Sequence, residues 1–193
     1  MKKVVAIDGP SGSGKSTIAK MLAERLEFRY LDTGALYRAV ALGLSRRGIT
    51  ESATDEEITG ALSGIRVRFR DGRTYLDGED VSSAVRTPEA GHYASVFSAR
   101  GPVREFLLPV QKDAAQHDDL VAEGRDMCTV VFPDAWKKFY FDASQEARAG
   151  RRYEQLREAG QEVTEQQALR DVRLRDDRDS SRDIAPLRVA EDA

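Results

Sequence analysis

The amino-acid sequence predicts an α/β fold in which a central parallel sheet lies between two layers of helices. Residues 4–7 form a strand-sized apolar run that leads into a glycine-rich loop and a helix, the unit from which such sheets are built. Residues 120–123 form a second short apolar run, which ends in an acid. Residues 65–76 alternate apolar and polar side chains around Asp71-Gly72, which is typical of an antiparallel insert.

The length of 193 residues suits one well-buried core, with room for an insert but not for a second ordinary domain. Charged residues make up 33% of the chain and the net charge is only -3, so we expect neither nucleic acid nor a membrane surface as a partner. The longest apolar runs are strand-sized and no signal peptide is recognisable, so we expect a cytoplasmic protein. The single cysteine, Cys128, excludes an internal disulfide, and His92 and His117 predict no metal cluster.

The loop after residues 4–7 has the spacing G-x-x-x-x-G-K-S, which is typical of a P-loop. Glycines let backbone N-H groups turn inward around phosphates, and a helix N-terminus favours anions. Lys15 offers a charge to the outer phosphates, and the Ser16 hydroxyl is placed to bind Mg2+. A chance match is the alternative, but chance rarely supplies the preceding strand and the following helix as well. The predicted triphosphate-binding residues are Gly9, Pro10, Ser11, Gly12, Ser13, Gly14, Lys15, Ser16 and Thr17.

The remaining segments alternate between strand and helix patterns, which together predict a three-layer α/β/α P-loop NTPase fold. In order, they are a strand at 28–32, a helix at 34–42 with Thr33 at its entrance, the antiparallel insert at 65–85, helices at 88–115 with a break near Gly101-Pro102, a strand at 138–142 and charge-rich helices at 146–182.

Glu123 ends the apolar run at residues 120–123. Strands of an open α/β sheet present ligand-binding residues at their carboxyl ends, so this acid is a candidate for Mg2+ or its water shell beside the phosphate loop. The alternative is a helix N-cap or a surface acid.

A set of arginines forms a second candidate feature. Guanidinium is permanently charged and forked, so it suits phosphate binding and the stabilisation of a transferring phosphoryl group. The alternative is that most of these arginines form solvent-screened pairs with neighbouring acids. No nucleophile and base pair is evident, as expected if the acceptor is itself a phosphate, and a mobile arginine-rich lid would align two polyanions. The set is Arg38, Arg86, Arg104, Arg125, Arg148, Arg151, Arg152, Arg175, Arg178 and Arg182.

Six motifs resemble those of bacterial cytidylate kinases, which are nucleoside monophosphate kinases, and they run in order along nearly the whole chain. Beside the phosphate loop, the most specific are L-D-T-G-A-L-Y-R at 31–38, E-G-R-D at 123–126 and R-D-D-R-D-S-S-R at 175–182. Shorter matches are V-R-T at 85–87 and T-V-V-F-P-D-A at 129–135. The resemblance implies Mg2+-dependent transfer of the γ-phosphoryl group of ATP to CMP or dCMP in pyrimidine metabolism, by a monomer.

The resemblance also implies roles for individual residues. Catalysis would depend on Lys15, Arg125, Arg152 and Arg182. The CMP phosphate would bind Thr33, Arg38 and Arg125, and the ribose hydroxyls and phosphate would contact Arg175, Asp179 and Arg182. Cytosine would face Ser95, Arg104 and Asp126, which agrees with its chemistry, because its exocyclic amine donates to a carboxylate while its ring nitrogen and carbonyl accept. The metal would be held by Ser16 and, through water, by Glu123.

The same resemblance divides the single domain of residues 1–193 into a core at 1–60 and 88–143, a monophosphate-binding β insert at about 61–87 and an arginine-rich lid at about 144–183. Two departures from the family pattern carry further expectations. Cys128 stands where the family usually has glycine, so it either strains the backbone or packs its thiol inward. The sequence ends at Ala193, and we expect the family's usual C-terminal strand and helix to be absent.

Two alternative functions stay open from the residues alone. The phosphate loop and the lid do not choose the second substrate, so a kinase for another small acceptor is one alternative. A nucleotide-binding module with impaired turnover, because of Cys128 and the short C-terminus, is the other.

Overall fold

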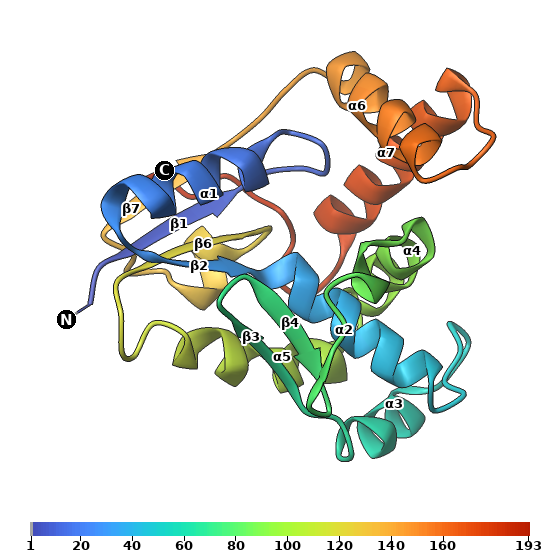
Figure 1. Cartoon of the computed structure of the whole chain (residues 1–193), viewed down its shortest axis with the longest axis horizontal. Helices are drawn as coiled ribbons and strands as arrows, with labels where there is room; N and C mark the ends of the chain where they lie inside the picture. Colours follow the sequence, from blue (N-terminus) through green and yellow to red (C-terminus); the bar gives the residue numbers. More distant parts are fainter. Residues whose placement is uncertain (1) are drawn as a thin grey trace.

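A computed structural model describes residues 2–193 (Figure 1). Its main sheet has four parallel strands in the order β2-β6-β1-β7. Every residue of β1 and β6 is buried, as expected for strands inside a parallel sheet. The register brings the carboxyl ends of three strands together, because Glu123 lies opposite both Ile7 and Asp32. The strands are β1 (Val4–Asp8), β2 (Arg29–Asp32), β6 (Leu120–Gly124) and β7 (Lys137–Tyr140).

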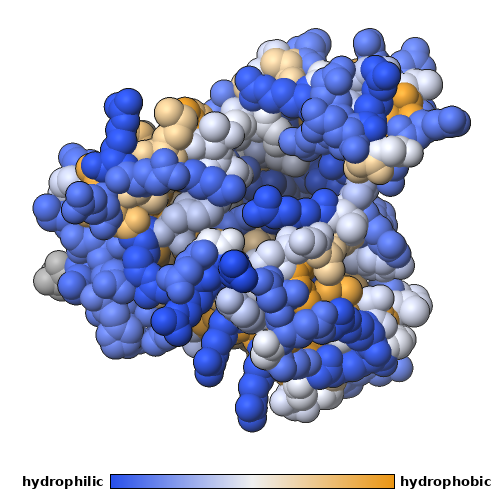
Figure 2. Space-filling model, viewed as in Figure 1, coloured by the Kyte–Doolittle hydropathy of each residue, from blue (hydrophilic) through white to orange (hydrophobic). Residues whose placement is uncertain are grey.

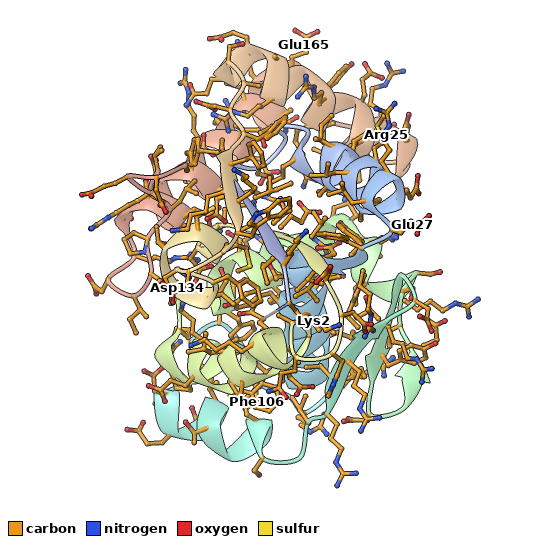
Figure 3. All side chains as sticks on the ribbon, turned by 90° about the vertical axis from the view of Figure 1, so that its left-hand side faces the viewer. Lys2, Arg25, Glu27, Phe106, Asp134 and Glu165 are labelled. Carbon is orange, nitrogen blue, oxygen red and sulfur yellow. The ribbon has the colours of Figure 1, made fainter. Side chains whose placement is uncertain are left out.

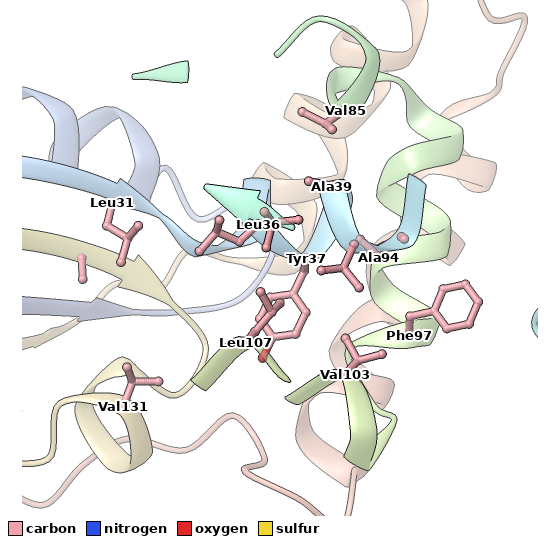
Figure 4. Close-up of a cluster of buried hydrophobic side chains, with 14 of the residues drawn as sticks. Leu31, Leu36, Tyr37, Ala39, Val85, Ala94, Phe97, Val103, Leu107 and Val131 are labelled. Carbon is pink, nitrogen blue, oxygen red and sulfur yellow. The ribbon is translucent and has the colours of Figure 1, made fainter. Parts of the chain in front are cut away.

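Helices cover both faces of this sheet. Helix α1 (Lys15–Leu26) packs Ala19 and Ala23 against one face. The larger core lies on the other face, where α2 (Thr33–Ser45) packs on β6, and α4 (Pro88–Phe97) and α5 (Gly101–Asp113) pack in turn against α2. Figure 4 shows this core around Leu36, Phe97 and Leu107. The predicted three-layer α/β/α fold class is confirmed.

Helix α3 (Asp55–Leu62) was not among the predicted elements. Thr54 and Glu57 form a capping box at its start, with the Glu57 side chain accepting from the Thr54 N-H at 2.7 Å. The T-x-x-E spacing is a recognised helix-start signal, so the sequence did hold a clue to this helix.

The insert is a separate three-stranded antiparallel sheet, as predicted. It consists of β3 (Val67–Arg70), β4 (Arg73–Leu76) and β5 (Glu79–Asp80). Its extended pattern ends earlier than predicted, because a 3-10 turn (Ala84–Arg86) follows Asp80 after a short link. Gly43 of α2 lets the insert approach closely, since a Cβ there would lie 2.9 Å from Ile65 and 3.1 Å from Leu76.

The charge-rich segment forms two helices, α6 (Gln145–Glu158) and α7 (Glu165–Ser181), which pack against each other (Figure 1). A second capping box, Thr164 with Gln167, starts α7 and accounts for the break in the predicted helical stretch. Figure 3 shows Glu165 at one end of the molecule and Phe106 of α5 toward the other. Figure 2 shows the surface hollowed between the α6–α7 pair and the rest of the molecule, with hydrophilic residues around the hollow.

Strand β7 forms one edge of the main sheet, beside exposed apolar side chains. Trp136 is 50% exposed and Phe139 is 44% exposed. The last residues run past this edge, where Lys138 Nζ lies 2.8 Å from Asp192 Oδ1. Across residues 2–193, no helix combines the length and the apolar character that crossing a membrane requires.

Candidate nucleotide site

The phosphate loop joins β1 to α1. A Cβ on Gly9 would lie 2.0 Å from the Phe141 carbonyl oxygen, so only glycine lets the loop pass this close to the chain after β7. Lys15 is the first residue of α1 and is 6% exposed, with Nζ donating to the Pro10 carbonyl oxygen at 3.2 Å. Burial, reinforced by the positive charge of Arg125, lowers the pKa of Lys15 to about 7. A bound polyphosphate would place a compensating negative charge beside this buried ammonium.

Proton uptake on triphosphate binding is a direct consequence of this low pKa. At pH 8 most of Lys15 is neutral in the free protein, and a nearby polyanion restores its ordinary pKa. We expect ATP binding at pH 8 to take up about one proton, measured by calorimetry in two buffers of different ionisation enthalpy. A Lys15→Met variant that takes up as many protons would contradict this assignment.

The structure brings Ser16 and Glu123 together, although 107 residues separate them. Ser16 Oγ donates to Glu123 Oε2 at 2.7 Å. The other carboxylate oxygen, Oε1, accepts from the Tyr30 hydroxyl. Glu123 is 3% exposed and is neither a helix cap nor a surface acid. Tyr30 was not predicted as a site residue.

A cavity beside these residues is lined by all nine of the predicted acceptor-binding residues. Arg104 and Asp126 line it and form a buried ion pair, and Arg182 Nη2 lies 3.9 Å from Asp126 Oδ1. The Thr33 hydroxyl donates to the Glu123 carbonyl oxygen at 2.6 Å. The predicted acceptor residues that line the cavity are Thr33, Arg38, Ser95, Arg104, Arg125, Asp126, Arg175, Asp179 and Arg182.

Several polar atoms of this cavity are buried without a hydrogen-bond partner. Among the described residues, seven buried side-chain nitrogen or oxygen atoms have none, and four of the seven belong to residues that line the cavity. Buried polar atoms are normally paired, so these atoms fit a ligand rich in acceptors. The four are Arg38 Nε, Ser95 Oγ, Arg175 Nη2 and Arg182 Nη2.

A second cavity continues from the first toward the phosphate loop. Lys15, Ser16, Glu123 and Arg152 line it, and they do not line the first cavity. Other residues line both cavities, so the two spaces adjoin; among them are Ser11, Gly34, Arg38, Arg125 and Arg175. Of the predicted triphosphate residues, Gly9, Pro10, Ser13, Gly14 and Thr17 line neither cavity.

Acids on α7 hold the arginines of the site. Asp171 accepts from Arg152 Nε at 2.6 Å and from Arg175 Nε at 3.2 Å. Asp179 accepts from Arg125 Nε at 2.7 Å. These arginines therefore form ion pairs and also line the cavities, so the two readings of the arginine set do not exclude each other.

Helix α6 touches the phosphate loop through two further arginines. Arg151 Nη1 donates to the Gly12 carbonyl oxygen at 2.9 Å. Arg148 Nη1 donates to the Ser11 carbonyl oxygen at 3.3 Å, and its Nη2 lies 2.7 Å from Asp176 Oδ2. The predicted lid thus meets the loop directly, a contact that the sequence did not predict.

Cys128 lies in a short π-helical turn (Met127–Val131) directly after Asp126. It is 2% exposed and is not among the residues with positive φ, so the inward-packed alternative is confirmed. Its N-H donates to Asp8 Oδ2 at 2.8 Å, and its Sγ donates to the Ala6 carbonyl oxygen at 3.5 Å. Burial, together with the nearby Asp8 carboxylate, raises the pKa of the thiol to about 12.

A Cys128→Gly variant is therefore expected to lose stability and to gain no activity. Removing the buried thiol and adding backbone freedom should lower the free energy of unfolding by about 1 to 2 kcal/mol, while turnover stays within about twofold. Denaturant unfolding and steady-state kinetics check both. A tenfold rise in turnover would instead mean that Cys128 limits the rate.

The fold, the phosphate loop and the two adjoining, arginine-lined cavities are those of a P-loop kinase. A sequence model described as cytidylate kinase matches residues 5–193. The chain belongs to the cytidylate kinase family.

Curated cytidylate kinases are similar to nearly the whole chain. The protein from Thermodesulfovibrio yellowstonii is 54% identical over 197 residues, covering 100% of this chain and 89% of its own length. Those from Thermosipho melanesiensis and Thermotoga neapolitana are 49% and 47% identical, each over 98% of this chain and 86% of their own lengths.

Proposed function

We propose that the protein transfers the γ-phosphoryl group of ATP to CMP or dCMP, which gives CDP or dCDP and ADP. The observation that carries this function is the pair of adjoining cavities, one at the phosphate loop and one lined by buried polar atoms without partners. The family supports the same reaction.

Charge neutralisation and alignment account for the reaction. The acceptor phosphate and the triphosphate repel each other, and the attacking phosphate oxygen is already ionised, so no general base is needed. Lys15 lies on the donor side, Arg182 on the acceptor side, and Arg125 lines both cavities. Together with Arg152 they would neutralise the charge that develops on the transferring group, and closure of α6 and α7 would exclude water.

Recognition of cytosine is assigned to the buried end of the acceptor cavity. Asp126 would accept from the exocyclic amine, while Ser95 and Arg104 would donate to the ring nitrogen and the carbonyl oxygen. The unpartnered Ser95 hydroxyl supports this assignment. Uracil lacks the amine and should be disfavoured.

Mg2+ is proposed as the cofactor, although within residues 2–193 no cluster of three histidine, cysteine or acidic side chains could hold a metal ion by itself. The hard oxygen donors present fit magnesium bound mainly through phosphates, because Ser16 Oγ and the Glu123 carboxylate adjoin each other beside Lys15. Ser16 would bind the metal and Glu123 its water shell. The metal would reduce the negative charge of the donor phosphates.

An acceptor panel tests the function. ADP formation is measured with ATP, Mg2+ and each of CMP, dCMP, UMP, AMP and GMP; CMP and dCMP should be preferred strongly. Equal rates with all five would favour a kinase of broader acceptor range, and binding of CMP without turnover would favour the impaired module. The monomeric state, the cytoplasmic location and the division into core, insert and lid stay predictions.

A further inference from the structure

Tyr30 is a polar residue that lies next to the site but lines neither nucleotide cavity. It lies on β2 opposite Val121 of β6, two residues before Glu123. Paired residues of neighbouring parallel strands share a face, so the Tyr30 and Glu123 side chains lie on the same side of the sheet. The Tyr30 hydroxyl donates to Glu123 Oε1, while Ser16 donates to Oε2 at 2.7 Å.

We propose that Tyr30 is a positioning residue that fixes the orientation of the Glu123 carboxylate toward Ser16 and the phosphate-bound metal. This inference rests on the proposed role of Glu123 in the water shell of that metal. The terminal torsion of a glutamate is broad, so a carboxylate held at one oxygen can still rotate. A hydrogen-bond donor at each oxygen holds the carboxylate in one orientation. Residues that hydrogen-bond to metal-site carboxylates commonly orient them in this way.

The surroundings of Tyr30 keep its hydroxyl a donor. Burial, followed by the charges of Asp32 and Glu123, raises the pKa of Tyr30 well above its ordinary value. A phenol hydroxyl has one proton to donate and a carboxylate oxygen accepts, so Tyr30 and Glu123 match as donor and acceptor.

The ring of Tyr30 also contacts the antiparallel insert. Phe69 of β3 meets it edge to face, with ring centroids 6.0 Å apart and an interplanar angle of 77°. Lys20 of α1 places Nζ 5.7 Å from the centroid of the same ring. The three side chains line a cavity of about 510 Å³ between α1, β2 and the insert. Phe69 is thus placed to support the ring whose hydroxyl holds Glu123.

The main test uses Tyr30→Phe, which keeps the ring and removes only the hydroxyl. The affinity for ATP is measured by calorimetry with Mg2+ and with EDTA, beside turnover at varied Mg2+. We expect the Mg2+ concentration for half-maximal turnover to rise about tenfold and the gain in ATP affinity from Mg2+ to shrink, as for other outer partners of metal sites. The affinity for ATP in EDTA and the KM for CMP should stay within about twofold. Tyr75→Phe is the matched control, because Tyr75 lies in β4 opposite Arg68, outside both nucleotide cavities.

Phe69→Leu tests the support from the insert and keeps the proposal testable should Tyr30→Phe fold poorly. It keeps the hydroxyl and removes the ring contact, so the Mg2+ requirement should rise about threefold. Because Phe69 acts through Tyr30, the double variant should need no more Mg2+ than Tyr30→Phe alone, whereas independent effects would multiply.

Glu123→Gln distinguishes the proposed metal role of Glu123 from the positioning role of Tyr30. If that variant leaves the Mg2+ requirement unchanged, the proposed metal role of Glu123 fails. If Glu123→Gln raises the requirement and Tyr30→Phe does not, Tyr30 has no positioning role while the metal role stands. A Tyr30→Phe protein that loses ATP affinity equally with Mg2+ and with EDTA would also overturn the proposal, because that loss marks a merely structural residue.

Discussion

Replacing Lys15 with methionine is expected to lower kcat by a factor of about 10³, the size of effect found when one preorganised charge is removed from a phosphoryl-transfer or oxyanion site. Lys15 is buried beside Arg125 and Glu123. Bulk water therefore cannot take over the role of its charge when the side chain is replaced by an uncharged one. The KM for CMP should change less than about threefold, because Lys15 does not line the acceptor cavity.

The same variant is expected to be more stable than the natural protein. The pKa of Lys15 falls from 10.5 to about 7 on folding, so below pH 7 the folded protein bears the cost of a buried charge. That cost disappears as pH rises to 10.5, where lysine in the unfolded chain also loses its proton. The stability gain should therefore be largest below pH 7. Denaturant unfolding at several pH values measures it, with Lys112→Met as the control on the exposed side of α5.

A Lys15→Met protein with lower activity but no higher stability would distinguish the catalytic role of Lys15 from the cost of burying its charge. It would support the catalytic role of Lys15 and contradict its buried charge. A Lys15→Met protein that retains more than about a tenth of the natural kcat would contradict the catalytic role itself.

The parts of the fold that could be predicted depend on local signals. The phosphate loop, its strand and its helix are contiguous, and the Asp71-Gly72 turn fixes a hairpin within a few residues. Helix α3 has an equally local capping signal at Thr54. The apolar pattern that follows this signal covers too few residues to predict a helix by itself.

The interactions within the site depend on register, which a single sequence does not determine. Tyr30 meets Glu123 because β2 pairs with β6, although 93 residues separate them. The partner of each arginine likewise depends on how α7 packs, since Asp179 holds Arg125 across 54 residues. Residue type predicted that the arginines suit phosphates, whereas only the packing of α6 and α7 reveals which acids pair with them.

Replacing Asp126 with asparagine is expected to reduce kcat/KM for CMP about 10²-fold to 10³-fold, because a site built around a polar contact rejects a mismatch strongly. The amide presents a donor where the exocyclic amine of cytosine needs an acceptor, and it loses the charge that pairs Arg104. The carbonyl oxygen at the same position of uracil can accept from that amide. The preference for CMP over UMP should therefore shrink at least about 10²-fold.

Binding of ATP distinguishes recognition from general damage in this variant. Asp126 lines only the acceptor cavity, so the affinity for ATP should stay within about threefold even though Arg104, which is 7% exposed, loses part of its pairing. Asp192→Asn, at the exposed partner of Lys138, is the control for loss of one negative charge. Equal losses of CMP use and ATP binding in Asp126→Asn would mean that the buried pair with Arg104 supports the fold, because a base-reading carboxylate must affect the acceptor alone.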